Sequence, residues 1–346
     1  PDEKLLFVAN ANINTLAVVD VSVRGKGRSL GFIPTGWYPT SVRVTPDGKK
    51  LLVANGKGII SKANPGGPQP GKKAAPGTTS EYIAGLFKGT LSVIDLPKRA
   101  DFEKQLEKYT ATAYRCSPLK QDNSPTLARP ADSPIPGKLG EASPIKYCLY
   151  IVKENRTYDQ VFGDLPQGNS DPRLCIFGRQ VTPNHHRLAE EFVLIDNLFC
   201  DAEVSVDGHS WSNAAYATDF NEKRWPPQYG GHSASVRGPA DHPSSGYLWD
   251  LAAKKGLTYR SYGEFAERVS DGSNILAQGR VTALVNHTCP KFLRGRDTEK
   301  LSVFLEEFDA YEKNYDAKDP ALRLPNYIVM SLGEDHTQGT TPGAPT

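Results

Sequence analysis

The chain has no long uninterrupted apolar run; its apolar stretches, such as residues 147–152, have the length of a β-strand. A bilayer-spanning helix needs about 18 apolar residues in succession, so we expect no transmembrane segment. An excess of one charge sign is also missing, because 41 lysines and arginines stand against 39 acids and the net charge is only +2. With so small a net charge the protein has no overall positive potential that would attract a polyanion, so we expect no nucleic-acid partner.

Clustered cysteines are missing too. No C-x-x-C pair occurs, which argues against a structural zinc site, and the five cysteines are scattered: Cys116, Cys148, Cys175, Cys200 and Cys289. An odd number leaves at least one thiol without a partner in the chain. One or two disulfides in an oxidising compartment, which we favour, and five buried thiols in the cytosol both remain open. Met330 is the only methionine, so we interpret the chain as a fragment, in which a signal peptide cannot be judged.

What the chain does have is enough length and apolar content for two or more domains: 346 residues, 38% of them hydrophobic. Its 31 glycines and 27 prolines exceed average usage and favour a loop-rich or β-rich construction over a helical bundle.

An internal repeat occupies the N-terminal part. The sequence LFVAN at 6–10 recurs as LLVAN at 51–55, and TLAVVD at 15–20 recurs as TLSVID at 90–95. The first pair lies 45 residues apart, near the length of about 40–45 residues of a four-stranded propeller blade. These motifs and the PDGKK at 46–50 resemble the YVTN family of β-propeller repeat proteins. The resemblance covers about two blades and implies a partial β-propeller, because two blades cannot close a ring.

The second copy carries an insertion over residues 56–89 that is rich in Gly, Pro and Lys. It is either a solvated surface loop or a basic loop that contacts a partner, so a protein partner at the propeller is one expectation. A helix is predicted over 101–114, followed by six prolines between 117 and 146. We therefore expect propeller blades over 1–98, a helix and a proline-rich linker over 99–144, and a second domain over 145–346.

The second domain opens with a candidate metal site. Residues 147–152 form a continuous apolar run, typical of a buried strand in a parallel sheet, and the run ends at Lys153, Glu154 and Asn155. Ligands of open α/β sheets bind at the carboxyl ends of strands. The side chains of Glu154 and Asn155 offer oxygen donors that suit Mg, Mn, Ca or Zn ions. A helix cap with a charged first turn explains the same residues without a metal.

A candidate nucleophile follows a second predicted strand, 192–197. We expect Asp207-Gly208 to be the turn that enters a helix, which places Ser210 at the helix N-terminus. Free backbone N–H groups there favour an alkoxide and a phosphate, and a cation held by Glu154 could lower the pKa of the hydroxyl. An ordinary N-cap serine is the alternative.

Four ordered blocks, 143–165, 194–220, 246–265 and 324–343, resemble the phosphoesterase family of acid phosphatases and bacterial phospholipases C, within the alkaline phosphatase superfamily. Bifunctional proteins of that superfamily join YVTN blades to such a domain in this same order. The resemblance implies a multidomain protein: a partial β-propeller followed by an α/β domain with a central, mostly parallel sheet. It also implies one or more divalent metal ions.

The resemblance further implies roles for particular residues. Glu154 and Asn155 match the metal-binding pair, and Ser210 matches the nucleophile that also contacts the metal. Asn213 completes the motif and is expected to help hold the phosphate. His336 matches a histidine that faces the phosphate, with Asp335 beside it as a weaker candidate. Further acidic ligands of the family lie beyond the position of residue 346, so we expect residues 1–346 alone not to turn over.

The function expected from these residues is metal-dependent hydrolysis of phosphate esters through Ser210, in a periplasmic or extracellular protein. The alternative is a non-catalytic binding or scaffold protein at the cell surface or in the periplasm, in which any bound metal ion has a structural role. His209 is expected beside the site rather than as the general base, and the consecutive His185 and His186 are expected at the rim or in structural roles. A helix around 304–311 should pack its apolar side on the sheet, next to a strand over 327–332.

Overall fold

The computed structural model describes residues 3–59, 87–116, 130, 132–137, 141–228, 239–268, 274–276 and 296–336. The described residues fall into two compact units, with the division between residues 131 and 132. Most of the insertion over 56–89, much of the proline-rich segment, Cys289 and the tail after His336 lie outside the described residues. Within the described part, no helix is long and apolar enough to cross a bilayer.

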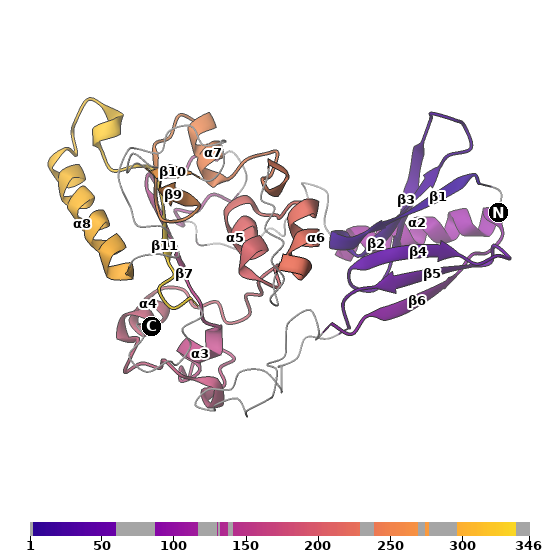
Figure 1. Cartoon of the computed structure of the whole chain (residues 1–346), viewed down its shortest axis with the longest axis horizontal. Helices are drawn as coiled ribbons and strands as arrows, with labels where there is room; N and C mark the ends of the chain where they lie inside the picture. Colours follow the sequence, from indigo (N-terminus) through magenta and orange to yellow (C-terminus); the bar gives the residue numbers. More distant parts are fainter. Residues whose placement is uncertain are drawn as a thin grey trace. The chain divides into compact units, whose positions relative to one another are not determined.

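Two three-stranded antiparallel sheets build the first unit (Figure 1). The internal repeat of the sequence reappears as repeated strand pairing. Asn10 pairs with Thr15 and Leu5 with Asp20 in the first sheet, and Asn55 with Thr90 and Lys50 with Asp95 in the second. The strands are, in order, β1 (Leu5–Asn10), β2 (Thr15–Asp20), β3 (Arg28–Pro34), β4 (Pro39–Val44), β5 (Lys50–Asn55) and β6 (Thr90–Asp95). The described strands do not form a closed ring, and the partial propeller stays a prediction.

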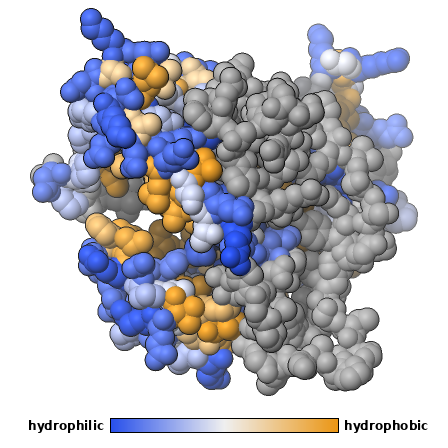
Figure 2. Space-filling model, turned by 60° about the vertical axis from the view of Figure 1, so that its left-hand side comes forward, coloured by the Kyte–Doolittle hydropathy of each residue, from blue (hydrophilic) through white to orange (hydrophobic). Residues whose placement is uncertain are grey.

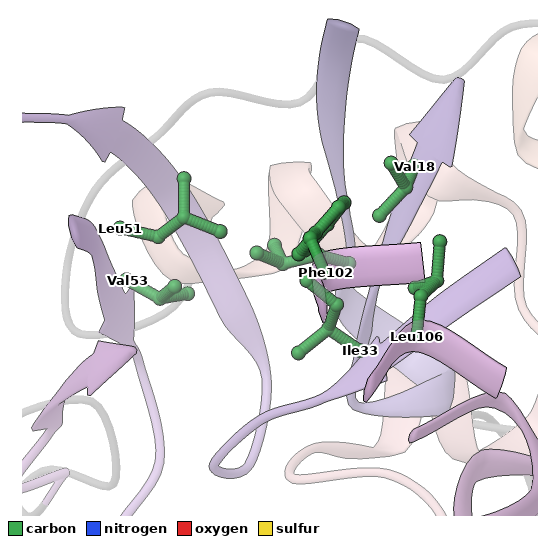
Figure 3. Packing of buried hydrophobic residues seen from close by; sticks show 7 residues of the cluster. Val18, Ile33, Leu51, Val53, Phe102 and Leu106 are labelled. Carbon is green, nitrogen blue, oxygen red and sulfur yellow. The ribbon is translucent and has the colours of Figure 1, made fainter. Parts of the chain in front are cut away.

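Alternating residues of both sheets and one helix form the core of the first unit (Figure 3). Successive side chains of a strand point to opposite faces, which is why the buried positions are spaced by two: Leu16 and Val18 on β2, Leu51 and Val53 on β5. Phe102 and Leu106 of α2 (Arg99–Cys116) complete this core. The helix that the sequence assigned to the connecting region 99–144 therefore belongs to the first unit.

Glycine permits the close approach of α2 to β3. At Gly31, φ is +151°, and a Cβ atom would collide with the hydroxyl of Thr110 on α2. That hydroxyl accepts a hydrogen bond from the backbone N–H of Phe32 at 2.9 Å.

A three-layer α/β arrangement forms the second unit (Figure 1). Its sheet has the order β7 (Cys148–Lys153), β11 (Tyr327–Leu332), β8 (Tyr259–Tyr262), and both pairings are parallel. Ile328 and Met330 of β11 pack toward Val303 and Phe304 of α8 (Asp297–Lys313). Val329, on the opposite face, packs with residues of α7 (Leu248–Lys254). The strand predicted over 327–332 is confirmed by β11.

The remaining elements surround this sheet. A two-stranded antiparallel pair follows β8 in the chain. The helices and strands are α3 (Tyr158–Phe162), α4 (Pro183–Glu191), α5 (Ser205–Ala214), α6 (Asp219–Gln228), β9 (Ala266–Arg268) and β10 (Asn274–Leu276), with short 3₁₀ helices at Ala11–Ile13, Pro172–Leu174, Pro239–Asp241 and Pro320–Leu322.

Two strand predictions for this unit need correction. Residues 192–197 form no strand: α4 ends at Glu191, and Phe192 and Val193 are 73% and 77% exposed. The strand over 147–152 was predicted to be buried, but β7 pairs only with β11 among the described strands. As an edge strand it leaves Leu149 and Ile151 nearly half exposed. Figure 2 shows apolar residues at the surface of one face of the molecule.

The apolar side of α8 only partly packs on the sheet. Phe304 contacts it, whereas Leu301, Leu305 and Phe308 stay 45%, 49% and 39% exposed. An ion pair also holds the helix: the guanidinium of the buried Arg260 on β8 donates two hydrogen bonds to Glu307, at 3.1 and 2.8 Å.

The disulfides that we favoured from the sequence are not found among the described residues. Cys116, Cys148, Cys175 and Cys200 are free thiols.

Replacing Leu106 tests the role of α2 in the first unit. Leu106 is 3% exposed, so Leu106→Ala should leave a cavity and lower the free energy of unfolding by about 2–5 kcal/mol. Hydrogen exchange of the β2 and β3 amides reports this for the first unit alone. Leu91→Ala is the control, because Leu91 is 62% exposed and should change stability by less than about 0.5 kcal/mol. Equal exchange rates in both variants would contradict the packing of α2.

Candidate functional site

Acidic residues follow all three parallel strands of the second unit. Glu154 comes directly after β7, Glu264 comes two residues after β8, and Asp335 comes three residues after β11. Because parallel strands have their carboxyl ends at the same edge of a sheet, these residues gather on one side. This edge of the sheet is the candidate site.

His209 of α5 joins two of these carboxylates. Its Nε2 lies 3.2 Å from Oε2 of Glu154, and its Nδ1 lies 2.8 Å from Oε1 of Glu264. Asn213, one helical turn later, donates from Nδ2 to Oε1 of Glu264 at 2.7 Å and to the backbone carbonyl of His209 at 2.9 Å. The side chain of Glu264 is 1% exposed, so this cluster is held in the protein interior.

The two carboxylates keep His209 protonated. Burial on its own lowers the pKa of His209, because it disfavours the charged imidazolium. The hydrogen bonds to Glu154 and Glu264, and the negative charges of both, outweigh burial and raise the pKa to about 10. At neutral pH His209 is therefore a cation whose two N–H groups each donate a hydrogen bond to one carboxylate.

One oxygen of Glu154 is open to a further ligand. Oε1 of Glu154 is buried and finds no hydrogen-bond partner among the described residues. A carboxylate oxygen of this kind suits a divalent cation. However, within the described ranges no group of three His, Cys, Asp or Glu side chains is arranged to hold a metal ion. Of the predicted ligands, the structure thus offers Glu154 and does not assemble the complete set.

The structure turns Ser210 away from Glu154. Its hydroxyl accepts a hydrogen bond from Nδ2 of Asn221 at 3.3 Å and also contacts the hydroxyl of Tyr247. Ser210 is 2% exposed. Neighbouring residues of an α-helix point about 100° apart, so the face of α5 that brings His209 to Glu154 directs Ser210 elsewhere. Asn155, the other predicted ligand, is exposed.

The predicted helix start at Ser210 is wrong. Helix α5 begins at Ser205, so Asp207 and Gly208 lie inside the helix and Ser210 is its sixth residue. No helix N-terminus is therefore aimed from Ser210 at a phosphate. On the same face one turn earlier, burial raises the pKa of Asp207 to about 6, with the charges of Glu203 and Glu222 acting in the same direction.

Asp335 is engaged by a cation rather than left open to substrate. Nε of Arg156 lies 2.6 Å from Oδ2 of Asp335, and the guanidinium lies 4.8 Å from the ring centre of Phe177. Burial raises the pKa of Asp335, while Arg156 and Lys153 act against this. His336 is half-buried next to Asp335, and its backbone N–H donates to the carbonyl of Gly333 at 3.1 Å.

A cavity of about 350 Å³ opens beside Glu154. Lys153, Arg156 and Asp335 line its polar part, and residues of α3 and α4 line the rest, His185 among them. The adjacent His186 is fully buried and bonds to Asp164 at 2.7 Å. His185 is therefore at the rim of a cavity and His186 is structural.

Sequence reasoning missed Glu264, Arg156 and Lys153. A signal for Glu264 was present: the segment Tyr259–Tyr262 is a short strand rich in aromatic residues, and Gly263-Glu264 follows it as Glu154 follows β7. Arg156 gave no such signal, because its partner Asp335 is 179 positions away in the chain.

Comparison of the chain with protein-family models finds no match, and neither curated proteins nor solved structures match it. The residues of the site and the motifs of the sequence are therefore the basis for a functional proposal.

Titration of His209 should appear in the stability of the protein. The folded-state pKa of about 10 lies above the ordinary 6.5, so the stabilisation is complete below about pH 6.5 and is lost as pH rises through about 10. We expect His209→Gln to remove this decline of the free energy of unfolding, measured by urea unfolding at pH 6, 8 and 10.

His185→Gln is the matched control for this measurement. Burial and Lys153 lower the pKa of His185, so its contribution falls at acid pH and the decline toward pH 10 should persist. If the free energy of unfolding of the wild-type protein changed between pH 6 and pH 10 in the same way as that of His209→Gln, the position of a protonated His209 between two carboxylates would be contradicted.

Proposed function

We propose that the protein hydrolyses phosphate esters with the help of a divalent cation at the carboxyl-end edge of the β7-β11-β8 sheet. The observation that carries the proposal is the convergence of Glu154, Glu264 and Asp335 on one sheet edge, beside a cavity and with one buried oxygen of Glu154 unpartnered among the described residues. The similarity of the four sequence blocks to phosphoesterases supports the same reaction class.

In the proposed reaction Ser210 is the nucleophile. Its oxygen attacks phosphorus and loses its proton, the bond from phosphorus to the ester oxygen breaks, and the leaving oxygen takes up one proton to become the alcohol, so that protons balance. Water then cleaves the phosphoserine, which releases phosphate and restores the hydroxyl. A bound cation, where present, supplies positive charge that favours the ionised hydroxyl and balances the charge of the phosphate.

Ser210 has to change place for this role. Its hydroxyl now bonds to Asn221, whereas the adjacent His209 occupies the position beside Glu154. A rotation of α5 by one residue position, about 100°, would bring Ser210 to the position that His209 occupies and would move His209 away from Glu154. Binding a cation at Glu154 would favour this rotation, because the cation replaces the imidazolium as the positive partner of the carboxylate.

Turnover of p-nitrophenyl phosphate by the full-length protein tests the proposal. We expect hydrolysis in the presence of Mg, Mn, Ca or Zn ions and its loss on adding a chelator. Glu154→Gln and Ser210→Ala should each lower kcat by about 100-fold or more, because Glu154 is the proposed ligand of the cation and Ser210 is the proposed nucleophile.

The controls are chosen to match these two changes. Ser212→Ala removes an exposed hydroxyl from the same helix, and Glu306→Gln neutralises an exposed carboxylate outside the site; both should keep wild-type rates. Negligible turnover by the wild-type protein with every cation, or equal rates in all variants, would refute the hydrolase proposal. The non-catalytic scaffold would then be the better explanation of the protein's function.

A further inference from the structure

The cavity beside Glu154 has two chemically different parts. Its polar end lies where β7 finishes and carries Lys153, Glu154 and the Arg156–Asp335 ion pair. The remaining wall is apolar and comes from α3 and the segment between α3 and α4: Tyr158, Val161, Phe162, Phe177 and Val181. A ligand that fits both parts has a charged group at one end and an apolar body.

The charge of Lys153 indicates which charge the ligand's polar group carries. Arg156 is neutralised by Asp335 at 2.6 Å, whereas Lys153 forms no ion pair with any acid of the described residues. Burial lowers the pKa of the nearby His185, and the charge of Lys153 acts in the same direction, so His185 supplies a neutral polar group at the rim. Glu154 is paired with His209, so among the charged groups of the cavity the charge of Lys153 is the one left for a ligand, and it suits an anion.

Three aromatic rings line the cavity and indicate what kind of apolar group the ligand carries. The rings of Tyr158 and Phe162 lie 5.6 Å apart and are tilted by 48°, and the guanidinium of Arg156 lies 4.8 Å from the ring centre of Phe177. Aromatic side chains pack well against other rings, by face or by edge. The volume of about 350 Å³ is near the lower end for ligand pockets. It suits one ring system better than two acyl chains.

We propose that this cavity binds the organic group of aryl phosphates, with the phosphate at Lys153 and the ring against Phe162 and Phe177. The proposal rests on the proposed function in taking the anion to be a phosphate that reaches Glu154. It adds a substrate preference: phosphate esters of aromatic alcohols over those of small polar alcohols such as glycerol.

Binding of two phosphonates that cannot be hydrolysed tests the cavity separately from catalysis. Calorimetric titration of the full-length protein should show that phenylphosphonate binds about tenfold or more tightly than methylphosphonate, because only the former buries a ring. Lys153→Met keeps the apolar stem of the side chain and removes the charge, so it should weaken both ligands by similar factors. Phe177→Leu should weaken phenylphosphonate alone.

Matched variants lie outside the cavity. Lys146→Met removes an exposed lysine, and Phe192→Leu alters a phenylalanine that is 73% exposed; neither should change the affinity for either ligand. Equal affinity for the two phosphonates, or an unchanged preference in Phe177→Leu, would overturn the aryl proposal. Selective phenylphosphonate binding by a protein without turnover would keep this proposal and refute the hydrolase.

Discussion

The parallel pairing of β11 with both β7 and β8 is the constraint from which the candidate site follows. Parallel strands end at the same edge of a sheet, so the acids that follow each strand meet there although they lie far apart in the chain. Burial of β11 between two helical layers stabilises the arrangement, since Ile328 and Met330 face α8 and Val329 faces α7. Any change that separates β11 from its neighbours would disperse Glu154, Glu264 and Asp335.

Several charged groups buried in the second unit have partners of opposite charge. His209 lies between Glu154 and Glu264, Arg260 pairs with Glu307, and Lys300 on α8 lies 3.4 Å from Asp297. An unpaired buried charge is costly, whereas a paired one mainly fixes geometry. At His209 the imidazolium is the positive partner of both carboxylates, and in the proposed function a bound cation takes over that role at Glu154. Cation binding and the position of α5 are therefore linked in that proposal.

The local sequence pattern was enough to predict several helices and strands. It gave wrong predictions where burial depends on residues far away in the chain. The strand over 327–332 and the helix around 101–114 have clear periodicity, and both occur. The segment 192–197 has an apolar pattern as strong as that of β7, yet it is irregular and exposed, because a strand also needs a partner with free backbone groups. At α5, the sequence DG at 207–208 favours a turn, but the helix starts earlier, at Ser205.

The sequence by itself determined the repeat and the position of Glu154 at the end of a strand, because these depend on alternation and on residues close in the chain. Only the tertiary structure decided that His209 rather than Ser210 meets Glu154, that Glu264 completes the cluster, and that Asp335 is held by Arg156. These contacts join residues 55 to 179 positions apart. Which side of a helix faces a sheet edge is set by the packing of whole elements, and no local pattern carries that information.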